Sequence, residues 1–318
     1  MGNIKRGVFN LLYNRPQFFD SIVSNFLTFL PDKLYLSLRY RCKMRQWINW
    51  DNPKTFSEKI QWLKVYNRQP KYTMMVDKYS VKKYVADLIG EEHVIPTLGV
   101  WDTTEEIQWD LLPDQFVLKT TQGVGGGGVV ICRDKSTFDK DKATKALNIS
   151  LKHDIYSLLR EWPYKNVSRR IIAEKYIAPD DPGMSTDLSD YKFFCFNGEP
   201  LYCQVIRDRS IEETIDFYDM DWNQMDFIGL VPMRRGEWDS SIKRGDIPVL
   251  RPENLDDLKN ICRKLAEGVP FIRVDLYVVG NHAYFGELTF YPASGMGTFE
   301  PEEWQYKLGD LIVLPKSM

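Results

Sequence analysis

The sequence predicts a mixed α+β fold with antiparallel sheets, and three features lead to this class. Segments with helical spacing of apolar residues alternate with short apolar runs typical of buried strands. The pair Asn197-Gly198 lies between two such runs and is a strong signal for a two-residue hairpin. Residues 271–290 form a second apolar hairpin. Tight hairpins connect antiparallel strands, so a layered α+β architecture is favoured over a doubly wound parallel sheet.

Four segments have the periodicity and end signals of helices. The first begins at Thr55, where Glu58 completes a capping box. The second is closed by Gly90 and the last by Gly268, because glycine readily adopts the conformation that ends a helix. We therefore expect helices over residues 55–67, 77–90, 136–161 and 252–268.

Strands are expected where apolar runs are short and bounded by turn residues. Two of them flank a glycine-rich loop, and a third contains the sequence AEKYIA. The expected strands cover residues 93–102, 115–120, 128–134 and 169–178, and the expected hairpins cover 191–206 and 271–290.

The chain has 318 residues and a formal net charge of −2, so overall charge gives no reason to expect nucleic-acid binding. Residues 1–50 differ, because they hold eight Lys or Arg against two Asp, a local charge of +6. Two interpretations stay open: a helix packed on its own domain, or a helix lying on an anionic membrane surface. The apolar stripe of this segment comprises Phe18, Phe19, Ile22, Val23, Phe26, Leu27 and Leu30.

The cysteines and the apolar runs indicate a cytoplasmic protein, which the basic segment could hold peripherally at the cytoplasmic face of the membrane. Five cysteines form no CxxC pair, and four lie in apolar or helical stretches typical of buried thiols in a reducing compartment. No apolar run approaches the roughly 18 residues that span a bilayer. Three histidines without mutual spacing do not predict a zinc site.

The stretch KTTQGVGGGGVVIC, residues 119–132, joins two expected strands by a loop with few side chains. Glycines let backbone N–H groups approach phosphate oxygens, and Lys119 places a cation directly before them. The strand–loop–strand context excludes the P-loop and the Rossmann motif, because both need a helix after the loop. The stretch therefore predicts a phosphate site of another kind.

Asp275 and Glu287 are acidic residues in a hairpin otherwise filled with apolar side chains. Buried carboxylates without partners are unfavourable, so the pair suggests a cation between them. A clean two-residue turn would put the two acids on opposite faces of the hairpin. We therefore expect an odd-length loop or a bulge near residues 280–282, which places Asp275 opposite Glu287 and Arg273 opposite Thr289.

Three lysines occur where a phosphate site could use them. Lys78 opens an expected helix, Lys119 precedes the glycine loop, and Lys192 heads the Asn-Gly hairpin. Each could instead be a solvated surface lysine, although Lys119 and Lys192 interrupt otherwise apolar strands. Cations for phosphates and carboxylates for Mg²⁺ are the two parts that nucleotide chemistry requires.

In their order along the chain these parts resemble the ATP-grasp superfamily. Over about residues 50–310 the chain resembles the teichuronopeptide-biosynthesis (TupA-like) branch, found in bacterial cell-surface polysaccharide loci. The stretches that carry this resemblance are NPKTFSEKIQWLKVYNRQP, VDKYSVKKYV, VLKTTQGVGGGG and FGELTFYPASG. The resemblance implies two α+β subdomains whose antiparallel sheets clasp the nucleotide, with the glycine loop closing over its phosphates.

ATP and Mg²⁺ are the cofactors that the resemblance implies. Its lysines would contact the phosphates, and the strand around Glu174 would read adenine through its backbone. The residues implied to bind ATP are Lys78, Lys119, Gly123, Gly125, Gly126, Gly127, Glu174, Tyr176, Ile177 and Lys192.

The implied metal ligands are Asp275 and Glu287, which would bridge Mg²⁺ to the β- and γ-phosphates. Thr289 stands where many relatives carry Asn and is a weaker ligand, so the number of metal ions stays open. Arg273 and Lys192 are the expected catalytic residues, with Arg273 stabilising the transferring phosphoryl group and an acyl phosphate.

The resemblance also implies a substrate site and a division of the chain. Ser294 and Gly295 lie where relatives grip a substrate carboxylate, which predicts two N–H donors there. The ribose-binding acid stays open among Asp180, Asp181 and Asp187. The expected division is a basic helical segment 1–50, an N-terminal α/β region 51–112, a small subdomain 113–178 and a large subdomain 179–318.

Three functions agree with these features to different degrees. The first is an ATP-dependent carboxylate–amine ligase that joins an amine or amino acid to a sugar acid of a bacterial capsule or other cell-surface polysaccharide. The second is a glycosyltransferase, since Asp219-x-Asp221 is a DxD that could hold a metal and a sugar nucleotide. The third is an ATP-dependent glycan kinase on the same scaffold.

Overall fold

The computed structural model describes residues 15–124, 128–178, 188–207, 213–231, 233–234, 237–238 and 243–316. Three loop glycines, Gly125, Gly126 and Gly127, lie outside these described residues, as do the three candidate ribose acids.

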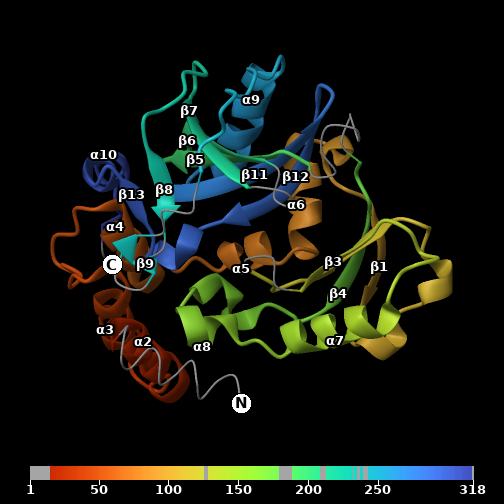
Figure 1. Cartoon of the computed structure of the whole chain (residues 1–318), viewed down its shortest axis with the longest axis horizontal. Helices are drawn as coiled ribbons and strands as arrows, with labels where there is room; N and C mark the ends of the chain where they lie inside the picture. The colour runs from red at the N-terminus through yellow and green to blue at the C-terminus, as the bar shows by residue number, and fades with distance from the viewer. Residues whose placement is uncertain are drawn as a thin grey trace.

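One sheet has four antiparallel strands in the order β1-β4-β2-β3 (Figure 1). Helix α7 (Lys140–Leu151) packs against β2 and β3. Between them lies a separate core that includes Phe116, Leu118 and Leu147. The strands are β1 (Thr97–Trp101), β2 (Phe116–Thr120), β3 (Val129–Cys132) and β4 (Ile171–Lys175).

The second sheet has five antiparallel strands in the order β12-β11-β5-β6-β7, and α9 (Leu255–Ala266) covers one face of it (Figure 1). The expected Asn-Gly hairpin joins β5 to β6. Asn197 and Gly198 have φ values of 51° and 92°, as a type I′ turn requires. The strands are β5 (Asp190–Phe196), β6 (Glu199–Arg207), β7 (Thr214–Asp219), β11 (Phe271–Val279) and β12 (His282–Thr289).

Further helices and short strands surround these two sheets. The helices are α2 (Arg15–Phe26), α3 (Asp32–Met44), α4 (Phe56–Tyr66), α5 (Lys71–Val76), α6 (Ser80–Ile89), α8 (Ile155–Leu159) and α10 (Glu303–Leu311). The 3-10 turns are η1 (Glu91–His93), η2 (Thr104–Glu106), η3 (Trp109–Leu111), η4 (Trp162–Asn166) and η5 (Pro292–Gly295). The short strands are β8 (Ile228–Val231), β9 (Met233–Arg234), β10 (Glu237–Trp238) and β13 (Thr298–Glu300).

Helix α4 begins as the sequence predicts and enters the core of the five-stranded sheet. Thr55 caps it and Glu58 closes the capping box. Phe56, which is fully buried, packs edge-on against Phe271 and Phe299. These contacts join the start of α4 to strands from the C-terminal quarter of the chain.

The single helix expected over residues 136–161 is wrong, because the chain forms two helices there. α7 ends at Leu151, and Asp154 then caps α8 by accepting the N–H of Ser157. Asp154 is a better helix start than a helix interior residue, since its carboxylate competes for backbone N–H groups.

The segment 51–112 is divided between the two cores of the molecule. α4, α5 and α6 contribute buried residues to the core of the five-stranded sheet. β1, from the same segment, pairs with β4 in the four-stranded sheet. The chain therefore passes from one sheet to the other before residue 113, which the expected division placed at a subdomain boundary.

The N-terminal helices α2 and α3 pack on the body of the protein. This packing is one of the two interpretations that the sequence left open. Arg39 pairs with Asp20 of α2 at 2.8 Å and also donates to the carbonyl oxygen of Leu158. Tyr35 donates to the same carbonyl, and Arg160 pairs with Asp32 at 3.0 Å. Part of the basic charge of this segment is therefore neutralised internally.

Two further expectations can be compared with the described residues. Cys132, Cys195, Cys203 and Cys262 are free and buried, and Cys42 is partly buried. Within the described ranges, no helix has both the length and the apolar character to cross a bilayer.

Replacing Phe56 with Ala is expected to lower the free energy of unfolding by about 3–5 kcal/mol, because it leaves a cavity among three aromatic rings. Chemical denaturation followed by circular dichroism measures this loss. Phe26→Ala is the matched control, since Phe26 is 72% exposed and its loss is expected to change stability by less than about 0.5 kcal/mol. Equal losses in the two variants would contradict the placement of α4.

Candidate functional site

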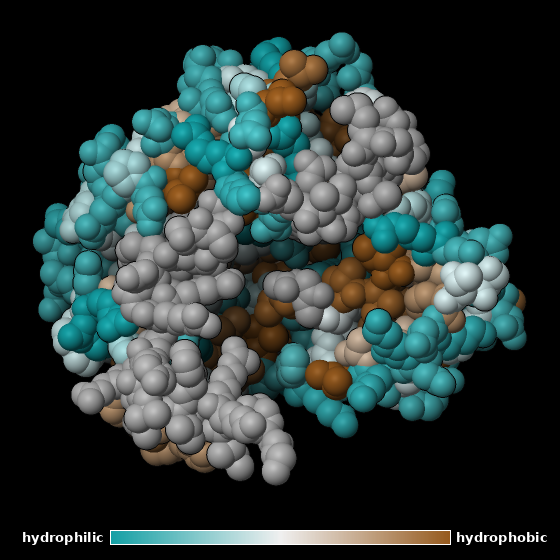
Figure 2. Space-filling view, viewed as in Figure 1, coloured by the Kyte–Doolittle hydropathy of each residue, from teal (hydrophilic) through white to brown (hydrophobic). Residues whose placement is uncertain are grey.

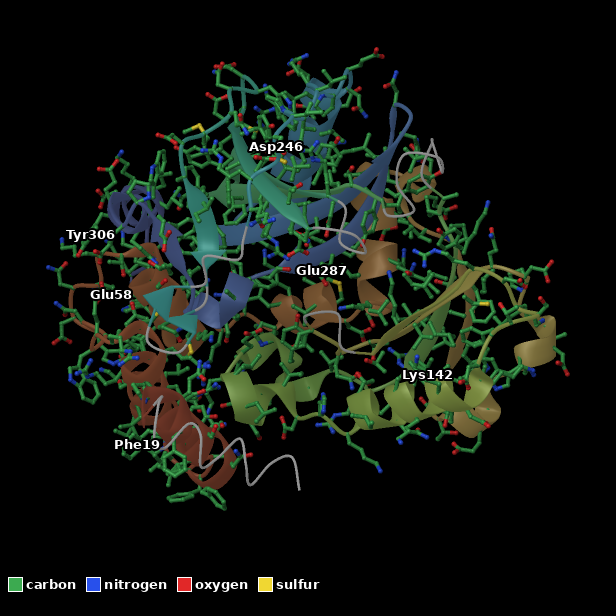
Figure 3. All side chains as sticks on the ribbon, viewed as in Figure 1. Phe19, Glu58, Lys142, Asp246, Glu287 and Tyr306 are labelled. Carbon is green, nitrogen blue, oxygen red and sulfur yellow. The ribbon has the colours of Figure 1, made fainter. Side chains whose placement is uncertain are left out.

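The two strand-borne acids lie opposite each other on β11 and β12. Asp275 pairs with Glu287 and Arg273 pairs with Thr289, which confirms the expected register. Figure 3 shows Glu287 near the centre of the molecule, between the two sheets. Four functional groups from two strands therefore share one face of the hairpin.

The bulge that produces this register lies beside the acids and not at the turn. Val279 pairs with His282 across a two-residue turn, so the expected loop or bulge near residues 280–282 is wrong. Gly286 is the extra residue, because the ladder shifts by one position directly after the Asp275 pair. A Cβ atom at Gly286 would lie 3.0 Å from a carbonyl oxygen of β11, which explains the glycine.

Asp275 is buried, and both of its carboxylate oxygens accept hydrogen bonds from cations. Arg273 donates Nε to Oδ1 and Nη2 to Oδ2, each over 2.7 Å. Lys192 Nζ lies 2.5 Å from Oδ2 and 2.7 Å from the carboxylate of Asp190. Burial disfavours the charge of Arg273, but Asp275 outweighs burial and raises the pKa of Arg273 above its usual range.

Glu287 is the more open of the two acids, with 38% of its side chain exposed. Lys78 Nζ and Arg273 Nη2 each lie 3.4 Å from its oxygens, and the Thr289 hydroxyl lies 3.3 Å away. Desolvation raises the pKa of Glu287, but Lys78 and Arg273 outweigh it and lower this pKa to about 2. Lys78, Lys192, Arg273, Asp275 and Glu287 are hereafter called the central ion network.

Lys78 connects this network to the start of the glycine loop. Its ammonium donates to the carbonyl oxygen of Gly123 over 2.7 Å, and its backbone N–H donates to the carbonyl of Thr121. The structure therefore brings Lys78, Gly123 and the two acids together from three distant parts of the chain.

Lys119 lies in a second group of charges next to the first. Glu174, which is buried, forms ion pairs with Lys119 at 2.6 Å and with Lys82 at 2.5 Å. Burial raises the pKa of Glu174, but the two lysines outweigh burial and lower it below the usual value. Glu174 and its two lysines line a small cavity together with Lys78 and Gly286. The cavity has a volume of about 10 Å³, which leaves room for about one water molecule.

The resemblance assigns adenine binding to β4 and the residues that follow it, and their surroundings differ from one residue to the next. The backbone of Glu174 is paired with both β1 and β2, and its part in reading adenine stays a prediction. The side chain of Glu174 faces the lysines. Tyr176 and Ile177 follow the end of β4, and the Tyr176 hydroxyl accepts from Arg133 at 3.4 Å. Tyr176 lines a different, open surface depression and does not join the cavity around Glu174.

The residues of these two groups fit a magnesium–triphosphate ligand by the chemistry of their donors. Mg²⁺ is commonly held by one or two carboxylates together with phosphate oxygens and water, and Asp275 and Glu287 supply two carboxylates. Lysine and arginine side chains around them match the charge of phosphates. Within the described ranges, no group of three or more His, Cys, Asp or Glu side chains could hold a metal by itself.

Ser294 does not present its N–H group as the sequence predicts. That N–H donates to the carbonyl of Tyr291 over 2.8 Å, so Ser294 is not a free N–H donor in this structure. Its hydroxyl and carbonyl accept from Lys64, and the carbonyl of Gly295 accepts from Gln61. The turn follows Glu287 closely in sequence, because it begins shortly after β12 ends.

The DxD pair has a structural explanation at the end of β7. Asp219 accepts the backbone N–H groups of Asp221 and Asn223 at 3.0 and 2.8 Å, and its other oxygen accepts the Asn223 side-chain amide. This is an Asx-type turn, a common use of aspartate between strands. The sequence feature that favoured a glycosyltransferase is therefore accounted for by local structure.

Sequence reasoning missed Lys82, Asp190 and Glu161. Lys82 lies in the first turn of α6, four positions after Lys78, and this spacing of two lysines at an expected helix start could have been noticed. Asp190 precedes Lys192 by two positions, which puts them on the same face of β5. Glu161 is a buried acid at the start of η4 and had no motif to mark it.

An α+β molecule with two antiparallel sheets and a cluster of lysines, arginine and acids between them has the architecture of the ATP-grasp fold. The model of the TupA-like ATP-grasp family matches residues 58–313. The match covers more than half of the chain, so this protein belongs to the TupA-like ATP-grasp family, as its motifs suggest. Among curated proteins, no sequence matches it.

Solved structures similar to this chain include three ligases. D-alanine–D-alanine ligase from Bacillus anthracis has a TM-score of 0.42 and 16% identity over 75% of this chain and 66% of that one. The Helicobacter pylori enzyme has a TM-score of 0.41 and 14% identity over 81% and 69%. The ATP-grasp ligase PsnB with minimal precursor, Mg and ADP has a TM-score of 0.38 and 12% identity over 80% and 65%. This chain spans just under two thirds of the Bacillus anthracis chain.

The stabilising effect of Glu287 is expected to depend on pH in a defined direction. Its pKa falls from 4.5 to about 2 on folding, so the folded state is stabilised by the ionised form. This contribution is complete above about pH 5 and is lost as pH falls towards 2. Urea unfolding of wild type and Glu287→Gln from pH 2 to 7 is expected to show a stability gap that closes on acidification.

Glu303→Gln is the control for this titration. Glu303 is an exposed residue of α10 whose partner, Lys307, lies one turn away on the same helix. Such surface pairs contribute less than about 1 kcal/mol, so this variant is expected to show little gap at any pH. A Glu287→Gln gap that stays constant down to pH 2 would contradict the ion pairs assigned to Glu287.

Proposed function

We propose that this protein is an ATP-dependent carboxylate–amine ligase that acts through an acyl phosphate. The observation that supports the proposal most is the convergence of Lys78, Lys119 and Lys192 with Asp275 and Glu287 between the two sheets. Cations and paired acids in one cleft suit the activation of a carboxylate by phosphoryl transfer. The two solved D-alanine–D-alanine ligases and PsnB are ligases by name, which agrees with this class.

In this proposal the lysines and acids of the central ion network would change partner when the nucleotide binds. Lys78 and Lys192 leave the carboxylates and contact phosphate oxygens, which frees oxygens of Asp275 and Glu287. Mg²⁺ held by these two acids would shield the phosphate charge and orient the γ-phosphate. Arg273 remains buried beside Asp275 and stabilises negative charge on the transferred group.

Lys82, Lys119 and Glu174 are assigned to the other end of the nucleotide. They line one cavity with Lys78, so the row of positively charged side chains extends from the central ion network to the four-stranded sheet. The present volume of the cavity is far too small for a nucleotide. Binding therefore requires the two sheets to separate or these side chains to turn.

The substrates proposed are a sugar acid and an amine or amino acid, in the synthesis of a bacterial capsule or other cell-surface polysaccharide at the cytoplasmic face of the membrane. The support for this setting is the TupA-like family, whose motifs the chain carries. An ATP-dependent glycan kinase is the alternative, since the same cations and acids would serve transfer of phosphate to a hydroxyl.

Glu287→Ala is expected to reduce ADP release by about 100-fold or more, because it removes half of the paired acids. ADP release is measured for a panel of sugar acids with and without amines, and it is expected to need both substrates. Glu303→Ala, a change at an exposed residue of α10, is expected to leave the rate unaltered. ADP release that needs no amine and yields a phosphorylated sugar would favour the kinase, and undiminished turnover in Glu287→Ala would contradict the metal assignment.

The proposal also includes contact of the N-terminal helices with an anionic membrane surface. Phe19, Phe26 and Phe29 are 52%, 72% and 78% exposed, and Lys33 nearby in sequence is exposed as well. Figure 3 shows Phe19 at the outer edge of the molecule. Aromatic side chains beside lysine suit insertion at an interface rich in anionic lipids.

The double variant Phe26→Ser/Phe29→Ser is expected to weaken binding to vesicles of phosphatidylglycerol and phosphatidylcholine by about tenfold or more, because apolar area is no longer buried in the lipid. Vesicle sedimentation measures this binding. Leu250→Ser, a change at a residue 88% exposed elsewhere on the surface, is the control. Equal binding to vesicles of pure phosphatidylcholine, or no binding to either kind of vesicle, would contradict the proposed contact with an anionic membrane surface.

A further inference from the structure

One face of α4 carries three buried polar residues that none of the nucleotide contacts uses. Ser57, Gln61 and Lys64 are separated by four and three positions, so they lie along one stripe of the helix. Each is 0% exposed. A buried polar stripe is unfavourable unless its groups find hydrogen-bond partners, and here most of the bonds are directed to one loop.

That loop follows β12, the strand that carries Glu287. Ser57 donates to the carbonyl oxygen of Gly297 over 2.9 Å. Gln61 donates to the carbonyls of Ser294 and Gly295, each over 2.8 Å. Helix α4 therefore holds the loop at successive backbone positions.

The loop is held in a conformation that its residues do not favour. Ala293, Ser294 and Gly295 have φ values of 48°, 54° and 61°, three left-handed residues in succession. For a residue other than glycine this conformation costs about 1 kcal/mol or more. Gly295 could not be replaced without movement, since a Cβ there would lie 2.6 Å from Ile60 of α4. Strain that is kept by surrounding contacts is typical of functional turns.

Lys64 uses all three of its protons in this arrangement. Its ammonium donates to the carbonyl oxygens of Leu159 and Ser294 at 3.0 and 2.8 Å, and to the Ser294 hydroxyl at 2.7 Å. Burial lowers the pKa of Lys64 to about 7, against the opposing charge of Glu161. The lysine thus fixes the position of the Ser294 hydroxyl and leaves no proton for a direct bond to Glu161.

Glu161 is the acid that interacts with the same hydroxyl. It is only 6% exposed, and burial raises its pKa while Lys64 and a hydrogen bond from Ser294 lower it. Glu287 acts on it electrostatically, and Tyr164 is close to both acids. The cluster therefore lies within electrostatic range of Glu287, the more open carboxylate of the central ion network.

We propose that Ser294 and Glu161 bind the amine of the second substrate, and that Lys64 is a positioning residue which holds Ser294 for this purpose. This inference rests on the ligase proposal. A hydroxyl accepts two hydrogen bonds, so Ser294 can accept from Lys64 and from an ammonium group together. The Glu161 carboxylate attracts that ammonium and takes up one proton through the Ser294 hydroxyl, which accepts a proton from the ammonium and passes its own to Glu161.

The free amine is then placed beside the activated carboxylate. Its nitrogen attacks the carbonyl carbon of the acyl phosphate, a C–N bond forms, and the bond from carbon to the phosphate oxygen breaks. The phosphate leaves with the electron pair and takes up the second proton from nitrogen. Ser294 is partly exposed, whereas Lys64 and Glu161 are buried behind it, so the hydroxyl is the member of the cluster that faces the substrate.

The test compares two nucleophiles in Lys64→Met and in its matched control, Lys59→Met. Lys59 is on the same helix but donates to the carbonyl of Ile312, away from the loop. ADP release is measured with the sugar acid and amine found in the substrate screen, and again with hydroxylamine in excess in place of the amine. Hydroxylamine reacts with an acyl phosphate at high concentration without a dedicated site.

Lys64→Met is expected to raise the KM for the amine by about tenfold or more, and to affect hydroxylamine-supported ADP release much less. Calorimetric titration with AMP-PNP and Mg²⁺ is expected to give wild-type affinity, which also verifies folding. Ser294→Ala, a change in a partly exposed turn, is a second variant with the same expected result should Lys64→Met not fold.

Equal loss with both nucleophiles, or the same behaviour in Lys64→Met and Lys59→Met, would overturn the amine site while leaving the ligase proposal intact. Wild-type protein that releases no ADP with any acid and amine of the panel would overturn the ligase proposal itself, and this inference with it. The two failures are therefore distinct.

Discussion

The structure depends most on the ion pairs that Arg273 makes on the face of β11. Its guanidinium holds both oxygens of Asp275 and reaches Glu287 on the neighbouring strand. Breaking a buried pair of this kind by removing one partner costs about 3–5 kcal/mol, because the remaining charge is left in a medium of low polarity. The bulge at Gly286 is what brings the two acids to the same face. One extra residue in β12 therefore decides whether the site exists.

The same network lies where the two sheets meet. Lys78 comes from the turn before α6, Lys192 from β5 and the two acids from β11 and β12. Lys78 joins the network to the end of β2 in the four-stranded sheet, because it donates to the carbonyls of Thr121 and Gly123. Figure 2 shows the surface hollowed in the region between the upper and lower parts of the molecule. In the absence of a bound anion, the acids neutralise the cations. An anionic ligand with its own metal would replace these pairs by others of the same kind, without leaving a buried charge alone.

The sequence predicted much of this arrangement because its signals are local. The capping box at Thr55, the Asn197-Gly198 turn and the apolar hairpin over residues 271–290 each depend on neighbouring residues, and each is observed. The family was likewise accessible from motifs. The position of the bulge could not be predicted in this way, because a bulge can shift the register from any point along a hairpin. A glycine inside the strand pattern, Gly286, was the available sign.

Other parts of the site depend on contacts between distant segments. Lys64 and Glu161 meet only after α4, η4 and η5 have packed together, so no spacing in the sequence joins them. The side chain of Glu174 faces two lysines because β4 lies in the middle of its sheet, which the sequence AEKYIA alone did not reveal. The break between α7 and α8 follows from a single capping aspartate, Asp154. These features needed the folded chain.

The central claim is that the cations and acids between the two sheets form one site for a magnesium–nucleoside triphosphate. Isothermal titration of the full chain with AMP-PNP, with Mg²⁺ and with EDTA, tests it most directly. The account predicts one binding event per chain that weakens strongly without Mg²⁺ and is lost in Lys119→Met combined with Lys192→Met. Binding that is indifferent to Mg²⁺, or an absence of binding to wild-type protein, would contradict it.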